Sequence, residues 1–155
     1  MGQPADLTRL IVEALYREAL LLAEEARTTF AASAQWSAIG DAEDLQQVAQ
    51  ACEALRTTTR TMRAIGWLLN QRAYFAGELS EFQLRRHCAL PPAEPDGEEE
   101  QLALLPNELF DLAERSRRFY ARIERLDRAW RQHFTMEPAA VLRLRERLGH
   151  AVAAF

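Results

Sequence analysis

Residues 45–76 read LQQVAQACEALRTTTRTMRAIGWLLNQRAYFA, a run that holds one glycine and no proline. Along this run, apolar or small residues recur at alternating steps of three and four, which is the spacing of one face of a helix in a bundle. These positions are Leu45, Val48, Cys52, Leu55, Thr59, Met62, Gly66, Leu69, Ala73 and Ala76. The run therefore predicts one long helix, over about 42–76, that packs through this face. Because Cys52 lies within the face, it is interpreted as a small core residue.

The second half of the same run is apolar at almost every angle around the helix axis. Ala64, Leu68 and Phe75 lie opposite the repeating face, and Trp67 and Tyr74 lie between the two. A helix that is apolar on every side is buried on every side. We therefore predict that Ala64, Leu68 and Phe75 form the contact surface of a homodimer. The alternative is a monomer in which a short or C-terminal helix of the same chain covers them.

Two further segments show the same helical spacing. Residues 6–32 repeat it at Leu7, Ile11, Leu15, Ala19, Leu22, Ala26 and Phe30, and residues 106–133 repeat it at Leu109, Leu112, Ser116, Phe119, Ile123, Leu126 and Trp130. Gly40-Asp41 separates the first helix from the second, and Gly77 ends the second. Ser80-Glu81-Phe82-Gln83 is a capping box that opens a short helix to about Cys88. A C-terminal helix is expected over about 138–155.

Residues 91–100, PPAEPDGEEE, are the one stretch without periodicity, and they carry five acids and no arginine. This composition favours a solvated linker, with an acidic docking segment as the alternative. The sequence thus predicts an all-α protein, an antiparallel three-helix bundle with an additional short helix and a C-terminal helix. The 155 residues form one domain, whose bundle core covers about 6–134.

The sequence contains no recognisable catalytic constellation. All 19 cations are arginines, so no lysine can act as a nucleophile or form a Schiff base. Cys52 and Cys88 are far apart, and His87, His133 and His150 have no partner at metal-ligand spacing. No phosphate-binding glycine loop, nucleophile elbow or zinc-protease motif occurs. We therefore expect a protein that is not an enzyme and that needs no cofactor or metal.

The formal net charge of −4 gives no overall field that would attract nucleic acid. The arginine-rich stretch 115–131 is the exception, but its arginines follow acids four residues earlier, which is the favourable order for pairs on one helix. These pairs are Asp111–Arg115, Glu114–Arg118, Glu124–Arg128 and Asp127–Arg131. We therefore expect no nucleic-acid binding. No signal peptide or membrane-length apolar run is present, so a cytoplasmic protein without membrane insertion is expected.

Residues 56–78, RTTTRTMRAIGWLLNQRAYFAGE, resemble a family of small alphaproteobacterial proteins that includes the regulator of CtrA degradation. A second similarity is YARI followed by RLD at residues 120–127. The residues that carry the resemblance are Thr59, Arg60, Met62, Trp67, Leu68, Leu69, Gln71, Arg72, Ala73, Gly77, Glu78, Arg122, Leu126 and Asp127.

The resemblance implies a dimeric helical bundle that acts as an adaptor in regulated proteolysis. In this family the best-known role is to help the ClpXP protease degrade a cell-cycle transcription factor, together with a response-regulator partner and at a cell pole. Two other interpretations remain open. One is a scaffold dimer unrelated to proteolysis, and the other is a helical protein that binds a small ligand near Trp67.

Overall fold

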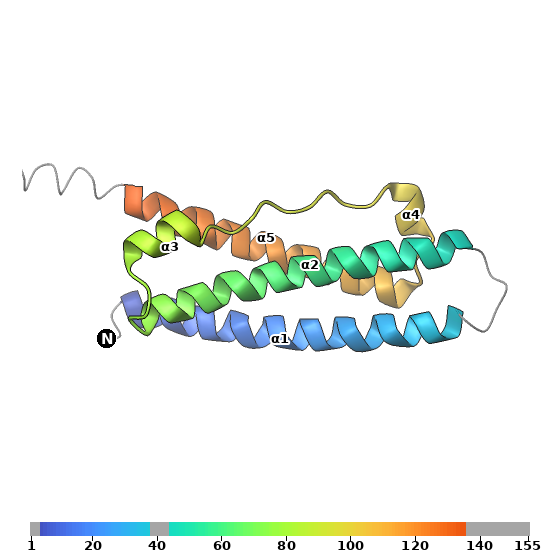
Figure 1. Ribbon diagram of the computed structural model, residues 1–155, viewed down its shortest axis with the longest axis horizontal. Coiled ribbons are helices and arrows are strands. Elements are labelled where there is room, and N and C mark those ends of the chain that lie inside the picture. The colour runs from blue at the N-terminus through green and yellow to red at the C-terminus, as the bar shows by residue number, and fades with distance from the viewer. Residues whose placement is uncertain (1–3, 38–43, 136–155) are drawn as a thin grey trace, which may run out of the picture. The chain divides into compact units, whose positions relative to one another are not determined.

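The computed structural model describes residues 4–37 and 44–135, and within these ranges it contains five helices and no strand. The helices are α1 (Pro4–Ser37), α2 (Asp44–Phe75), α3 (Glu81–His87), α4 (Glu99–Ala103) and α5 (Asn107–Thr135) (Figure 1). The predicted all-α class is therefore confirmed. Gly40-Asp41 and the helix expected over 138–155 lie outside the described residues.

The chain divides into two compact units, residues 1–123 and 124–155, and α5 runs from the first into the second. Of the second unit the structure describes the C-terminal part of α5, where Arg131 pairs with Asp127 at 2.9 Å. The first unit contains α1 to α4 and the beginning of α5, and it holds the core.

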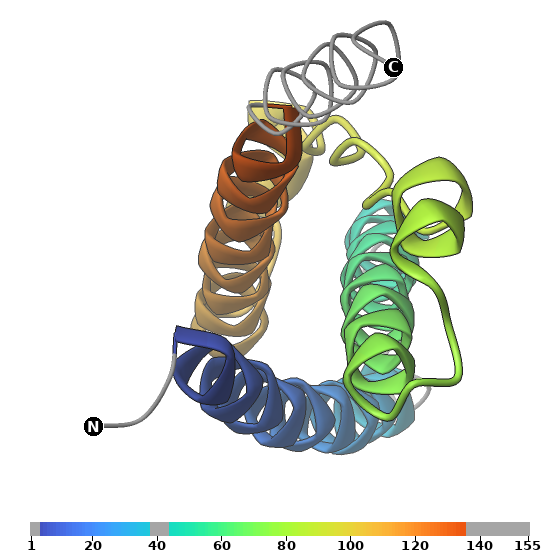
Figure 2. The same ribbon diagram turned by 90° about the vertical axis from the view of Figure 1, so that its left-hand side faces the viewer.

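The three long helices do not simply alternate in direction. In the first unit α1 is antiparallel to α5, because Arg115 pairs with Glu25 and Arg122 with Glu18. It is also antiparallel to α2, because Arg72 pairs with Glu13 and Ser33 bonds to Gln50. By contrast α2 and α5 are parallel, since Ala49 packs with Leu109 and Arg60 contacts Ser116. Parallel neighbours need a connection that returns along their length. The segment between α3 and α4 provides it, running beside α2 in Figure 1 and outside the three helices in the end-on view of Figure 2.

The core faces of α1 and of the first part of α5 agree closely with their sequence patterns. On α1 the predicted Leu15, Ala19, Leu22 and Ala26 are buried, although Val12 replaces Ile11 and Leu7 is exposed. On α5 every predicted position up to Ile123 is buried. These positions are Leu109, Leu112, Ser116, Phe119 and Ile123.

The predicted face of α2 is wrong, because this helix buries the opposite side. Leu45, Leu55 and Met62 of the predicted face are 73%, 69% and 60% exposed. We call the exposed large residues Leu45, Val48, Leu55, Met62 and Leu69 the outer stripe. The buried residues, which we call the inner face, are Ala49, Gln50, Glu53, Thr57, Arg60, Thr61, Ala64, Trp67, Leu68 and Gln71.

Both faces of α2 follow the same spacing. Gln50, Glu53, Thr57, Arg60 and Ala64 also alternate at steps of three and four, two residues out of step with the predicted face. At 3.6 residues per turn, two residues correspond to about 200° around the axis. The physical reason for the inward choice is that the polar side chains find partners on α5, while Ala64, Trp67 and Leu68 supply apolar surface on the same side.

The predicted dimer surface is corrected by the same observation. Ala64 and Leu68 are fully buried within the chain, at 0% exposure, and Phe75 is half-buried. A side chain already covered by its own chain offers no surface to a second copy. Ala64 and Leu68 are therefore core residues.

Both predicted boundary signals after α2 are confirmed. Gly77 has a φ of 78°, and the backbone N–H of Glu78 donates to the carbonyl of Ala73 at 2.9 Å, as in a glycine-terminated helix end. At α3 the Gln83 N–H donates to Ser80 Oγ at 3.2 Å, and the Ser80 N–H donates to Gln83 Oε1 at 2.9 Å. These two bonds form the capping box.

Candidate functional site

A buried carboxylate lies at the centre of the inner face of α2. The side chain of Glu53 is 1% exposed, and three guanidinium groups surround it. Its nearest oxygen–nitrogen distances are 3.5 Å to Arg117, 3.8 Å to Arg60 and 3.9 Å to Arg56. Thr57 Oγ1 also donates to Glu53 Oε1 at 3.3 Å. A buried charge is tolerated only when it is paired, and here the pairing joins α2 to α5.

Arg60 extends this cluster towards α5. Its Nη1 donates to Ser116 Oγ at 2.6 Å, and that hydroxyl donates to the carbonyl of Ala113 at 2.7 Å. Burial lowers the pKa of Arg60, because desolvation disfavours the charged guanidinium, and the carboxylate of Glu53 acts in the opposite direction. Nη2 of Arg60 and Nη2 of Arg117 are buried and have no hydrogen-bond partner among the described residues.

The extended segment of residues 91–98, which we call the acidic strap, is attached to this cluster from outside. Asp96 lies 2.7 Å from Arg117 Nε and 3.9 Å from Arg60 Nη2. Glu94 pairs with Arg63 at 2.8 Å. A Cβ on Gly97 would lie 2.8 Å from Arg56 Nη1, so a glycine allows the close approach there.

Two backbone carbonyls of the strap are also bound. Tyr120 donates its hydroxyl to the carbonyl of Pro91 at 2.6 Å, and Arg63 Nη1 donates to that of Pro92 at 3.4 Å. Residues 91–98 are in no helix and most of them are exposed, as a solvated linker would be, but two of the acids and two of the carbonyls also contact α2 and α5. The last two residues of the acidic stretch 91–100, Glu99 and Glu100, are the first residues of α4, a helix that was not predicted from the sequence.

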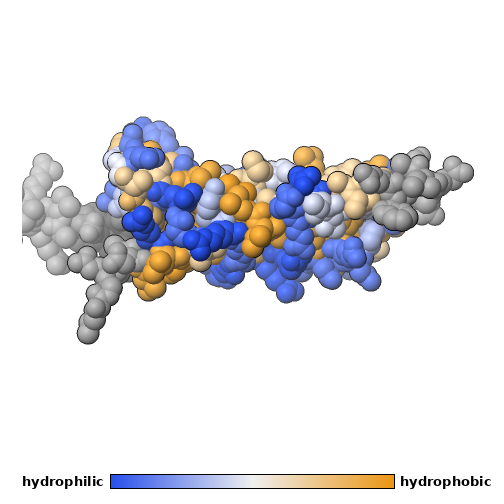
Figure 3. All heavy atoms as spheres, turned by 90° about the horizontal axis from the view of Figure 1, so that it is seen from below, coloured by the Kyte–Doolittle hydropathy of each residue, from blue (hydrophilic) through white to orange (hydrophobic). Residues whose placement is uncertain are grey.

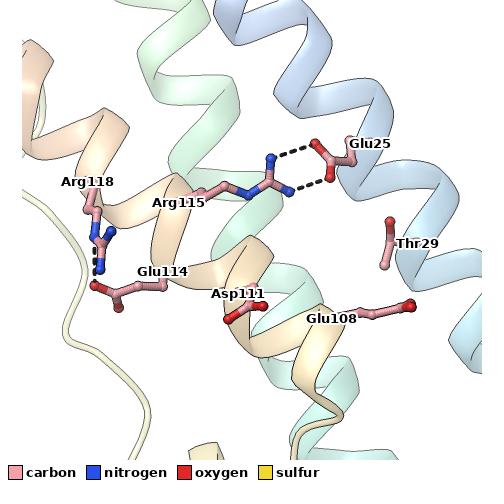
Figure 4. Close-up of a pocket in the computed structure, with 7 residues that line it drawn as sticks. All are labelled: Glu25, Thr29, Glu108, Asp111, Glu114, Arg115 and Arg118. Atoms are coloured by element: carbon pink, nitrogen blue, oxygen red, sulfur yellow. Dashed lines mark hydrogen bonds and ion pairs between the residues drawn. The ribbon is translucent and has the colours of Figure 1, made fainter.

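The arginines of α5 pair mostly with other elements. Of the predicted pairs within the helix, Glu114–Arg118 is present at 3.3 Å and Asp127–Arg131 at 2.9 Å. Arg115 instead uses two nitrogens to bind both oxygens of Glu25 on α1 (Figure 4), and this hydrogen bonding raises the pKa of Arg115. Arg122 pairs with Glu18 on α1.

The Arg115–Glu25 pair lies in a groove of about 540 Å³ between α1 and α5. Acids predominate among its lining residues, which are Glu25, Thr29, Glu108, Asp111, Glu114, Arg115 and Arg118 (Figure 4). Within the described part of the chain, no group of three or more His, Cys, Asp or Glu residues is placed to hold a metal ion. The groove is therefore a charged surface without a metal site among those residues.

The residues that carry the family resemblance have different surroundings. Arg60, Trp67, Leu68 and Gln71 are buried, whereas Met62, Leu69, Gly77 and Glu78 are exposed, and Thr59 and Ala73 are half-buried. Arg72 donates to Glu13 Oε1 at 2.8 Å, and its guanidinium lies 4.4 Å from the ring centre of Tyr16, so it joins α2 to α1. Leu126 and Asp127 are half-buried residues of the second unit.

Sequence reasoning did not identify Glu53, Asp96 or Arg117 as interacting residues. One available signal was the polar series Glu53, Thr57 and Arg60, whose helical spacing places three hydrogen-bonding side chains on one side of α2. The contacts of Asp96 had no local signal, because the strap is separate from both helices in sequence.

Exposed apolar residues form the other candidate surface. The outer stripe runs along α2, and α1 exposes Leu10 and Leu21 at 66% and 73%. The face over α1 mixes hydrophobic and charged groups (Figure 3). No helix among the described residues has the length and apolar character needed to cross a membrane.

Comparison with known proteins identifies the family. The family model described as "Protein of unknown function (DUF1465)" matches residues 4–152. No curated protein matches the chain. Among solved structures, the crystal structure of RcdA from Caulobacter crescentus CB15 is similar, with a TM-score of 0.58 and 29% sequence identity over 77% of this chain and 90% of that one. The chain therefore belongs to the DUF1465 family, and its helical bundle is RcdA-like.

Proposed function

We propose that this protein is a non-enzymatic adaptor that assists the ClpXP protease in degrading a cell-cycle transcription factor. The observation that carries the proposal is its similarity to RcdA, which extends over 77% of the chain at 29% identity. The motif at residues 56–78 supports it, and all of its buried residues belong to the inner face of α2. By the same resemblance, the protein acts in the cytoplasm with a response-regulator partner and is recruited to a cell pole.

The chemistry of the described residues is compatible with a binding role. The buried charges of Glu53 and Arg60 and the half-buried charge of Arg117 are paired with one another or with the strap, and they connect elements of the fold. Polar groups used in this way stabilise an arrangement of helices and give the molecule a fixed surface for recognition.

The adaptor proposal is tested by co-purification and by degradation in a reconstituted system. The tagged full chain, expressed in its native cell, is expected to recover ClpX, and the purified chain is expected to accelerate ClpXP degradation of the transcription factor recovered with it. If neither ClpX nor accelerated degradation is observed, the proposal is wrong and a scaffold role is favoured. A ligand-dependent change in tryptophan fluorescence would instead support the small-ligand interpretation.

We further propose that the protein is a homodimer joined through the outer stripe of α2. Leaving a Leu or Met side chain in water forgoes roughly 1.5–3 kcal/mol relative to full burial. The residues of the stripe keep a heptad-like spacing over the length of α2, so two copies can pack along it by a two-fold axis.

Light scattering on the Leu55→Glu, Met62→Glu variant tests the dimer. We expect a folded monomer, because both residues are exposed in the single chain. The matched control is Thr28→Glu, which adds a charge at an exposed polar position of α1 instead of α2 and should leave the dimer intact. A variant that is still dimeric would show that the stripe is not the contact.

A further inference from the structure

The acidic strap makes the kinds of contact by which proteins recognise an extended peptide. Two of its carbonyls accept hydrogen bonds from Tyr120 and Arg63, and two of its carboxylates, two residues apart, pair with Arg63 and Arg117. Three prolines restrict residues 91–95 to extended conformations, which lowers the entropy lost on binding.

The surface under the strap is a row of four arginines, Arg56, Arg60 and Arg63 on α2 and Arg117 on α5, which we call the arginine row. The helices supply two carboxylates to it, from Glu53 and Glu114, and the strap supplies the other two, from Glu94 and Asp96. Without the strap, the row would have twice as many cations as anions. This excess of cations favours an acidic occupant.

The strap also leaves hydrogen-bond donors of the arginine row without an acceptor. Nη2 of Arg60 has no hydrogen-bond partner, and Asp96 lies 3.9 Å from it, beyond hydrogen-bond distance. Nη2 of Arg117 likewise has none among the described residues. Because Arg60 is 6% exposed, these donors cannot be satisfied freely by bulk water. Asp96 lies within ion-pair distance of both arginines, so a carboxylate placed slightly closer to Arg60 would accept hydrogen bonds from both.

The strap itself is held by contacts that are individually weak. The side chains of Glu94 and Asp96 are 39% and 60% exposed, and exposed ion pairs contribute little. Pro91, Pro92 and Pro95 are exposed as well. The covalent connection to α3 and α4 at its two ends adds to these contacts.

We propose that the arginine row is a binding surface for an acidic, proline-containing extended segment of a partner protein, and that the strap occupies it as a tethered competitor. The partner segment would place two carboxylates, two residues apart, on Arg63 and on the Arg60–Arg117 pair. It would thereby release residues 91–98 from α2 and α5. This proposal does not depend on the adaptor role, since it concerns a contact that can be measured with the purified chain alone.

The test uses a fluorescent peptide with the sequence of the strap, LPPAEPDGE, residues 90–98. Its binding to the full chain is measured by fluorescence anisotropy and compared with binding to the Glu94→Gln, Asp96→Asn variant. The variant keeps the backbone of the strap but removes the competing carboxylates. Because a short tether gives an effective concentration in the millimolar range, we expect the variant to bind the peptide at least about tenfold more tightly than the unaltered chain.

Two matched controls show whether the arginine row is the site. Adding Arg63→Gln to the variant should abolish most of the gain, whereas adding Arg27→Gln, whose side chain is 69% exposed and pairs with Glu24 on α1, should not change it. The neutral peptide LPPAQPNGE should bind at least tenfold more weakly than the acidic one. Higher salt should weaken the acidic peptide as well.

The proposal is overturned if the variant binds the acidic peptide no more tightly than the unaltered chain, or if both peptides bind equally. Circular dichroism verifies that each chain is folded. Should the double variant not fold, Asp96→Asn alone keeps the Glu94–Arg63 pair and supports the same comparison, with the same two outcomes.

Discussion

The inner face of α2 buries Glu53, Thr57 and Arg60, whereas its outer stripe exposes Leu45, Leu55 and Met62 to water. The two faces belong to one helix and have the same spacing, but their chemistry is the reverse of what a surface helix usually shows. The contacts that each face of α2 makes explain this difference in chemistry. The polar side chains of the inner face reach groups on α5 and on the strap, whereas Leu45, Leu55 and Met62 of the outer stripe stay mostly exposed in the single chain.

The largest expected effect comes from removing the central charge of the inner face. Glu53→Gln leaves three arginines without their shared carboxylate, and losing one partner of a buried ion pair costs about 3–5 kcal/mol. The free energy of unfolding is measured by urea titration. The matched change is Glu25→Gln at the exposed pair with Arg115, for which we expect about 0–1 kcal/mol. Equal losses would contradict a special role for the buried cluster.

Neighbouring leucines give a sharper comparison of the two faces. Leu68 is fully buried and Leu69 is 43% exposed. We expect Leu68→Ala to lower the free energy of unfolding by about 2–5 kcal/mol, because it leaves a cavity in the core. Leu69→Ala should stay within about 0.5 kcal/mol of the unaltered chain when measured at concentrations too low for association. If Leu69→Ala lowered the free energy of unfolding more than Leu68→Ala, α2 would be rotated about its axis relative to this structure.

A smaller effect is expected where the inner face meets α5. Ser116→Ala removes the acceptor of the 2.6 Å bond from Arg60, and an unsatisfied buried donor costs about 1–3 kcal/mol. Thr28→Ala is the control, since Thr28 bonds to carbonyls of its own helix at an exposed position and should cost within about 0.5 kcal/mol. Thermal unfolding of the two variants distinguishes them.

The smallest change in the free energy of unfolding is expected when a leucine of the outer stripe is replaced by a polar residue. Leu55 is 69% exposed, so Leu55→Gln should alter the free energy of unfolding of the dilute chain by no more than about 0.5 kcal/mol. A denaturant titration at nanomolar concentration provides the measurement. A loss of several kcal/mol would mean that the stripe is covered within a single chain.

Much of the fold could be predicted because the relevant signals are local. The spacing on α1 and α5, the capping box at Ser80 and the turn at Gly77 each depend on residues within one or two turns of each other. The orientation of α2 could not be predicted in the same way, since two faces shared one spacing. The apolar content of the sequence favoured burial of the outer stripe. In the structure, contacts with α5 lead instead to burial of the inner face.

The candidate site was less accessible to sequence reasoning for the same reason. The Arg117–Asp96 bond joins residues 21 positions apart, and the Arg60–Ser116 bond joins residues 56 positions apart. Neither separation leaves a periodic pattern. The resemblance over residues 56–78 did point to Arg60, Trp67, Leu68 and Gln71, which the structure places in the core.

The polar residues Glu53, Thr57 and Arg60, in the middle of the inner face, affect how the partly folded chain behaves during its synthesis. α1 and α2 are adjacent in sequence and pack against each other, whereas Glu25–Arg115 and Glu18–Arg122 close loops of 90 and 104 residues. Short loops close at a lower entropic cost, so we expect the α1–α2 hairpin to form on the ribosome before α5 emerges. During that interval Glu53, Thr57 and Arg60 face water. These polar residues interrupt the apolar surface that Ala64, Trp67 and Leu68 form on the same face, which reduces the attraction of the nascent hairpin for other nascent chains.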